Sequence, residues 1–191
     1  MRTRIIAAAT ATATALTLAP FAAADPAPAT GVELNQPASQ VVAVEAKFDF
    51  AGDQETALRE LKQLRADMWD RNVPFDGKPL RQAAAAKGYT TKQQYVDAAK
   101  IDNGYARIAV QRGAEVARSF SHTRPYNSTC SNNCGAPTSA TWQGKGGYSA
   151  ENIHSTASIG RAMRGWGYEE VPALVAANGV FSPQNGHLYS L

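Results

Sequence analysis

Two histidines and two glutamates in the C-terminal half of the sequence are the residues best suited to form a polar site. His122 lies in the stretch R-S-F-S-H-T-R-P (118–125), where a helical pattern stops, and Glu151, Glu169 and His187 follow in three separate segments. Two imidazoles with one or two carboxylates would make a borderline zinc site with water in the open position. Without metal, a His–Glu pair can transfer protons near neutral pH. The alternative is a hydrogen-bonded polar network that only holds the fold together.

The charged and hydroxyl neighbours of His122 are given structural interpretations. Ser121 adjoins His122, but adjacency in sequence is not the hydrogen-bond geometry that a Ser–His nucleophile requires, so no nucleophile is assigned. Arg124 is interpreted as a solvated loop arginine rather than as the contact of an anionic ligand. Glu115 and Arg118, three residues apart, are interpreted as a solvated helical pair.

An amphipathic helix precedes this region and is expected to carry part of the core. Asp53 is its predicted N-cap, and a stripe of apolar residues that includes Leu64 and Met68 predicts an end near Arg71. Met68 and Trp69 are predicted to pack in the core rather than to bind a ligand. The Pro- and Gly-containing stretch 72–79 is predicted to be a loop.

Besides a short helix within residues 80–88 that stops at Gly88, capping and spacing patterns predict two further helices before His122. Thr90 or Thr91 can cap the first, because a glutamine stands three residues after each. Helical spacing from residue 105 to residue 120 predicts the second, which leads directly to His122. Small residues at 109, 113 and 117 form a stripe on this helix that would allow close packing against a sheet.

The last quarter of the sequence has weaker signals. Ser155 or Ser158 is expected to start a helix that Pro172 ends, and residues 181–187 are expected to form a loop that leads to His187. His154 stands three residues after Glu151, a spacing that would suit two ligands on one helical face. We favour an exposed surface histidine at this position.

The ends of the chain indicate export. Arg2 and Arg4 precede an apolar run and three alanines, which is the pattern of a signal peptide over residues 1–24. Residues 25–52 are expected to be a linker and N-terminal arm, and no membrane span is predicted after cleavage. Removing the two arginines changes the formal net charge from +3 to +1 (3 minus 2). This near-balance of charge argues against binding of nucleic acid, which requires a basic face.

The two cysteines agree with an oxidising compartment. Cys130 and Cys134 are the only cysteines of the chain, and they lie in a stretch rich in Asn, Ser and Gly. Such a pair in an exported protein predicts a disulfide, which in so short a ring contributes about 2 kcal/mol. A metal site would need two further ligands close by, and none follows at a typical spacing.

Four short motifs occur in an order typical of one family. They are F-S-H-T-R-P (120–125), E-N-I (151–153), W-G-Y-E (166–169) and N-G-H-L-Y (185–189). In this order they resemble the bacterial branch of the CAP superfamily, the cysteine-rich secretory, antigen 5 and pathogenesis-related proteins, also called SCP-like extracellular domains. The resemblance implies an α+β fold, a three-layer α/β/α sandwich around a small antiparallel sheet, in a domain over residues 53–191.

The resemblance also implies a cleft and a function. Position by position, the cleft is lined by His122, Glu151, Glu169 and His187, and the two histidines would hold zinc or another divalent metal. Glu170 is the alternative to Glu169. Family members continue through further strands where this chain ends at Leu191, so the final strands are expected to be missing. We expect a secreted protein that binds a lipid-like small molecule, a cell-wall component or a divalent metal. The alternatives are a metal-dependent hydrolase that uses the same four residues, and an incomplete, inactive domain.

Overall fold

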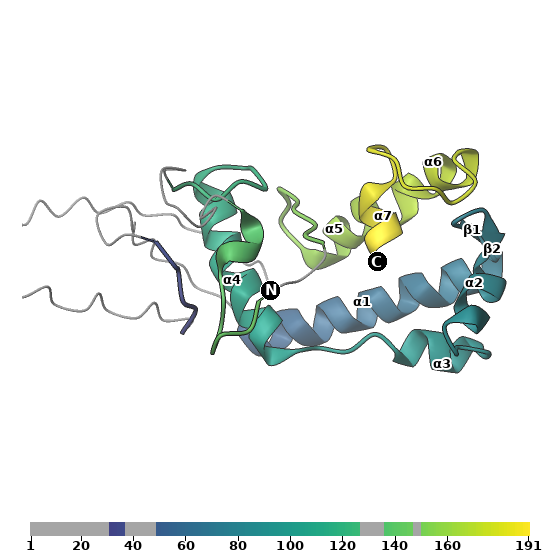
Figure 1. The fold of residues 1–191 in the computed structure, drawn as a ribbon, viewed down its shortest axis with the longest axis horizontal. Helices are drawn as coiled ribbons and strands as arrows, with labels where there is room; N and C mark the ends of the chain where they lie inside the picture. The colour runs from purple at the N-terminus through teal and green to yellow at the C-terminus, as the bar shows by residue number, and fades with distance from the viewer. Residues whose placement is uncertain (1–30, 37–48, 127–135, 147–149) are drawn as a thin grey trace, which may run out of the picture. The chain divides into compact units, whose positions relative to one another are not determined.

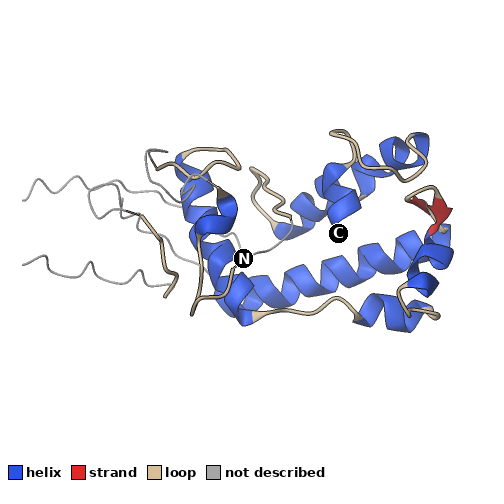
Figure 2. Ribbon diagram, in the orientation of Figure 1, coloured by secondary structure: helices blue, strands red, loops and turns tan. Residues whose placement is uncertain are grey.

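The computed structural model describes residues 31–36, 49–126, 136–146 and 150–191. These residues are mostly helical, with a small two-stranded antiparallel sheet, so the fold is broadly α+β (Figures 1 and 2). In this part of the chain, no helix has both the length and the apolar character needed to cross a membrane. The predicted signal peptide (1–24) and the predicted Cys130–Cys134 disulfide lie outside the described residues.

The chain divides into two compact units. Unit 1 contains Asp49–Ile101 and His154–Leu191, and unit 2 contains the described residues 31–36, 102–126, 136–146 and 150–153. Each unit has its own cluster of buried apolar side chains. The predicted domain of residues 53–191 spans unit 1 and most of unit 2.

Unit 1 begins with helix α1 (Phe50–Arg71). Its N-cap is Asp49, whose carboxylate accepts a hydrogen bond from a first-turn amide at 3.2 Å, so the prediction of Asp53 as N-cap is wrong. Asp53 lies in the first turn instead, where a carboxylate interacts favourably with the helix dipole. The helix ends where the sequence predicts, because Asn72 adopts the left-handed conformation that caps it.

The stretch predicted to be a loop contains a hairpin. Strand β1 (Pro74–Phe75) pairs antiparallel with strand β2 (Lys78–Pro79). The two turn residues, Asp76 and Gly77, have φ values of 49° and 73°. A two-residue hairpin turn of this kind needs positive φ at both positions, and Asp-Gly is a common sequence for it.

Two short helices follow the hairpin. Helix α2 (Leu80–Ala86) is followed by helix α3 (Lys92–Asp97). Thr91 caps α3, and the side chain of Gln94 returns to the backbone of the cap, so the predicted capping box is confirmed.

The C-terminal part of unit 1 is a series of short helices: α5 (Ile159–Trp166), the 3-10 turn η3 (Tyr168–Glu170), α6 (Val171–Ala176) and α7 (Gly186–Ser190). Ser158 caps α5, as predicted. The predictions for Pro172 and His187 are wrong. Pro172 lies in the first turn of α6, where its missing N–H removes no helical bond, and His187 belongs to α7 rather than to a loop.

The core of unit 1 forms on α1. Helix α1 packs against α5 and α3 (Figure 1). Met68 and Trp69 are buried, as predicted, and Met68 belongs to the apolar cluster. The buried members of this cluster are Leu64, Met68, Val73, Leu80, Leu174 and Leu188.

Unit 2 is built on helix α4 (Asn103–Arg118), which Asp102 caps through hydrogen bonds from two first-turn amides. A short 3-10 turn, η2 (Pro137–Ser139), also belongs to this unit. Residues 31–36, here termed the docking segment, pack on the unit, and Val32 forms a buried cluster with Ile108 and Ala140.

The small-residue stripe of α4 does not pack as predicted. Ala109, Gly113 and Ala117 are exposed, and a Cβ atom added at Gly113 would meet no heavy atom of the described residues within 4 Å. The side of α4 that faces the core is the one that carries Ile108. Small size at this spacing therefore marks a solvated face of the helix.

Candidate functional site

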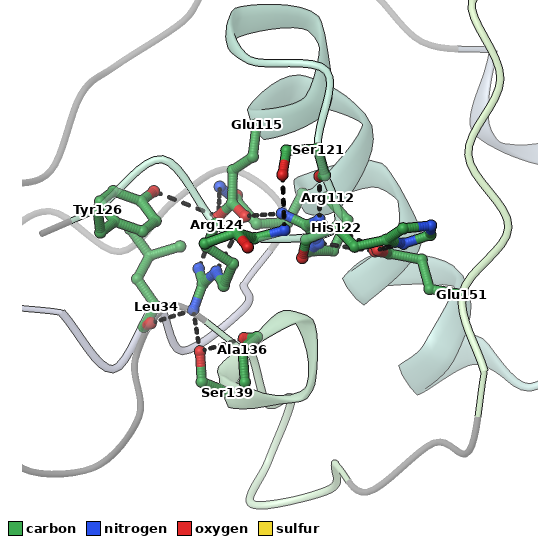
Figure 3. A network of polar contacts seen from close by, with 12 residues as sticks. Leu34, Arg112, Glu115, Ser121, His122, Arg124, Tyr126, Ala136, Ser139 and Glu151 are labelled. Atoms are coloured by element: carbon green, nitrogen blue, oxygen red, sulfur yellow. Dashed lines mark hydrogen bonds and ion pairs between the residues drawn. The ribbon is translucent and has the colours of Figure 1, made fainter. Parts of the chain in front are cut away.

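A buried group of charged side chains lies under the loop that follows α4 (Figure 3). Glu115 on α4 accepts hydrogen bonds from Arg124 at 2.9 and 2.6 Å and from Arg112 at 2.7 Å. The hydroxyl of Tyr126 donates to the same carboxylate at 3.2 Å. The relative exposure of Glu115 is 4% and that of Arg124 is 1%. One buried carboxylate is thus compensated by two guanidiniums and a phenol.

This arrangement corrects two predictions. Arg124 is a buried network member rather than a solvated loop arginine, and Glu115 pairs with Arg112 and Arg124 rather than forming a solvated pair with Arg118. The helical spacing could have indicated this burial, because Ile108, Arg112 and Glu115 stand at i, i+4 and i+7 on one face. A buried isoleucine on that face indicates that its charged residues also point inward.

The network sets the charge of its members. Burial alone would raise the pKa of Glu115, but hydrogen bonds from Arg124 and Arg112 outweigh it, and the pKa lies below its usual value. Burial alone would lower the pKa of Arg112, and hydrogen bonds to Glu151 and Glu115 raise it instead. Glu115 and Arg112 therefore stay charged at neutral pH.

Arg112 connects this buried group to Glu151. Its Nε donates to one carboxylate oxygen of Glu151 at 2.7 Å, and its Nη2 donates to the other at 3.1 Å. The same Nη2 also donates to the carbonyls of Ser121 and His122, at 3.2 and 3.3 Å. A two-pronged contact of this kind fixes both the position and the plane of the carboxylate.

His122 is the exposed end of the chain of contacts. Its Nδ1 lies 3.0 Å from Glu151 Oε2, and 54% of its side chain is exposed, against 12% for Glu151. Since a carboxylate only accepts hydrogen bonds, Nδ1 is the donor and Nε2 is the lone-pair nitrogen of the neutral ring. The structure therefore brings together two of the four predicted site residues, with the ring oriented by a carboxylate.

The serine beside His122 is engaged elsewhere. Ser121 Oγ accepts a hydrogen bond from the backbone N–H of Thr123 at 3.0 Å, which stabilises the turn after α4. This contact gives Ser121 a structural role in the loop that presents the imidazole.

The second predicted histidine forms a pair in unit 1. His187 Nδ1 lies 2.5 Å from Glu170 Oε1, and Glu170 Oε2 accepts from the backbone N–H of Leu188 at 3.0 Å. Glu170 therefore joins η3 to α7 and orients the ring. Glu169 is exposed, and Glu170 is the carboxylate that contacts His187.

Three of the four predicted residues thus belong to His–Glu pairs: His122 pairs with Glu151 in unit 2, and His187 pairs in unit 1 with Glu170, the alternative to Glu169. The convergence of the predicted residues in one cleft stays a prediction. Within the described residues, no three His, Cys, Asp or Glu side chains lie close enough together to hold a metal ion. Each pair supplies one imidazole and one carboxylate toward such a site. His154 belongs to unit 1 and is exposed, as predicted.

Comparison of the chain with known protein families, with curated proteins and with solved structures finds no match.

Proposed function

We propose that this chain is a secreted, CAP-like binding protein whose ligand contacts the exposed imidazole of His122. The His122–Glu151 pair is the observation that carries the proposal. The ring is half exposed, a carboxylate orients it, and the buried guanidinium of Arg112 holds that carboxylate at two points. A ring held in this way loses little freedom when a ligand binds, which favours affinity.

The exposed nitrogen indicates the chemistry of the ligand. Nε2 accepts a hydrogen bond or binds a divalent metal when the ring is neutral, and donates a hydrogen bond when it is protonated. A hydroxyl group of a cell-wall component suits both states, and a carboxylate suits the protonated ring. Phe120, two residues earlier, is 60% exposed and offers an apolar contact for a lipid-like group.

The proposal extends to the α/β/α sandwich of the CAP superfamily. Two observations support it: the order of the four motifs, and a helix, α4, that leads directly to the first of them. The sandwich requires more strand than the two-residue strands of the described hairpin. Backbone chemical shifts of the protein in solution test it, because they report strand content residue by residue.

Binding measurements with two histidine variants test the proposed function. The probes are zinc chloride, phosphatidylglycerol vesicles and purified peptidoglycan sacculi. His122→Ala removes the proposed contact, and His154→Ala is the matched control, because His154 is also exposed. A hydrogen bond to a charged group contributes about 1.5–3 kcal/mol, so His122→Ala should weaken binding of at least one probe by about 10- to 150-fold.

The control variant should bind like the wild type. Equal binding of wild type and His122→Ala to every probe, or no binding by the wild type, would contradict the proposal. Zinc-dependent cleavage of the sacculi that His122→Ala abolishes would replace it with the hydrolase alternative.

A further inference from the structure

The docking segment is bound to the rest of unit 2 through its backbone. The amide of Glu33 donates to the carbonyl of Thr141 at 2.7 Å, and the amide of Thr141 donates back to Glu33 at 3.2 Å. Val32, beside this pair, is 1% exposed and packs against Ile108 and Ala140. A single antiparallel pairing with one buried side chain thus joins residues that lie more than a hundred positions apart in sequence.

Side chains add specific contacts to this pairing. Glu33 accepts from the Thr141 hydroxyl at 2.5 Å and from the amide of Gly144 at 3.1 Å. Asn35 donates to the carbonyl of Ser139 at 2.8 Å and to the Thr141 hydroxyl at 2.9 Å. The docking segment therefore fits unit 2 in one register, with one apolar, one acidic and one amide side chain each in its own place.

The docking segment also reaches the buried network directly. The carbonyl of Leu34 accepts from Arg124 Nη1 at 2.7 Å, and the same nitrogen donates to Ser139 Oγ at 2.9 Å (Figure 3). The other edge of Arg124 faces Glu115. The guanidinium is thus held between a carboxylate of α4 on one side and the docking segment with η2 on the other.

From Arg124 the contacts continue without interruption to the exposed ring. Glu115 binds Arg124 and Arg112, Arg112 binds Glu151, and Glu151 binds the imidazole of His122. If the docking segment leaves, Arg124 loses the Leu34 carbonyl and gains access to water, so its hold on Glu115 weakens. Glu115 then competes with Glu151 for Arg112, and the carboxylate that orients His122 loses part of its support.

We propose that the docking segment is a strap that holds the exposed imidazole of His122 in place through the buried network, so that the orientation of the ring depends on whether residues 31–36 are docked. The relation is reciprocal, because a ligand that prefers the oriented ring must also favour the docked segment. A segment with few buried apolar side chains detaches at a low free-energy cost. Val32 is the buried apolar side chain of the docking segment.

The test is carried out on the full chain by NMR. Val32→Asp places a charge in an apolar site and should release the docking segment. Amide exchange of Thr141 reports docking, since that amide donates to Glu33. The chain has three histidines, so the ring signals can be assigned by single replacements. Val175→Asp is the matched control, because Val175 is 51% exposed.

In Val32→Asp we expect amide exchange at Thr141 to be at least tenfold faster and the ring signals of His122 to shift, while those of His154 and His187 stay unchanged. The control should alter neither. Faster exchange at Thr141 with unchanged His122 signals would overturn the proposal.

A milder variant covers the case in which Val32→Asp does not fold. Asn35→Ala removes two hydrogen bonds and leaves Val32 in place. In Asn35→Ala, amide exchange at Thr141 and the ring signals of His122 should both change in the same directions as in Val32→Asp, and by smaller amounts. Ring signals that do not follow Thr141 exchange across the variants would overturn the inference. No ligand is added, so this outcome is independent of whether the protein binds any of the probes above.

Discussion

At the scale of single residues, the geometry of the exposed histidine depends on charges that water does not reach. A carboxylate with two guanidiniums is unfavourable to bury, and the desolvation is offset only when every lone pair and N–H finds a partner. Glu115 meets this condition through Arg112, Arg124 and Tyr126. Breaking one pair leaves Glu115 with a buried charge that the remaining partners offset only in part.

Arg124→Ala should therefore be strongly destabilising. Removing one partner of a buried ion pair lowers the free energy of unfolding by about 3–5 kcal/mol, because the remaining charge stays buried. Urea denaturation followed by Trp fluorescence measures the change. Arg118→Ala is the control, since Arg118 is exposed at the end of α4, the helix that carries Glu115, and its loss should alter stability by about 0.5 kcal/mol or less. Similar values for the two variants would show that the Arg124 pair contributes nothing.

The sequence contained part of this site. His122 and Glu151 could be selected from motifs, and the structure places them 3.0 Å apart. Arg124 could not be recognised, because its burial depends on the carbonyl of Leu34, ninety residues earlier in the chain. Every residue type has a backbone carbonyl, so the sequence does not indicate which residue provides such a contact.

At the scale of elements, local rules predicted helix starts where side chain and backbone act within one turn. The sequence offers Thr90 or Thr91 for α3 and Ser155 or Ser158 for α5, and the structure has Thr91 and Ser158, each with a side-chain oxygen that accepts from the amide three residues later. For α1 two aspartates, Asp49 and Asp53, stand close to the start, and the sequence alone does not rank them. The sequence Asp76-Gly77 is typical of a hairpin turn, but the prolines at 74 and 79 favoured the prediction of a loop.

Two glycine-to-alanine changes separate a packed turn from an open helix face. Gly179 has a φ of 73°, and a Cβ there would lie 2.4 Å from the backbone of Phe75, so Gly179→Ala should destabilise by about 1–3 kcal/mol. Gly113→Ala should stabilise by about 1 kcal/mol, because it adds helix propensity on the exposed face of α4. Thermal melting of both variants measures whether the melting temperature falls in Gly179→Ala and rises in Gly113→Ala. Destabilisation by Gly113→Ala would mean that the small-residue stripe packs after all.

At the scale of the whole molecule, both units contain carboxylates held in the ionised form. In unit 1, a hydrogen bond from Lys62 lowers the pKa of Asp97. In unit 2, a hydrogen bond from Lys145 lowers the pKa of Asp102, and a hydrogen bond from the Thr141 hydroxyl lowers that of Glu33. The pKa of buried Glu115 is also lowered, because its arginine contacts outweigh burial. These groups act in the same direction on stability.

We therefore expect acid to weaken the fold. A carboxyl whose pKa is lower in the folded state takes up its proton first in the unfolded state, so its contribution is complete above the ordinary Glu value of about 4.3 and is lost as the pH falls below it. Urea denaturation between pH 7 and pH 3 should show a constant free energy of unfolding down to about pH 5 and a steady decrease below it.

Salt separates the buried contribution from the exposed ones. At 1 M NaCl the Debye length is about 3 Å, so the exposed pairs Lys62–Asp97 and Lys145–Asp102 are screened, whereas Glu115 is shielded from the ions by burial. The acid-induced loss of stability that persists at 1 M NaCl then belongs to Glu115 and to Glu33, whose pKa is lowered by neutral hydrogen-bond donors. If that loss disappears, the buried network does not resist protonation, and the support it gives to His122 would have to come from packing instead of charge.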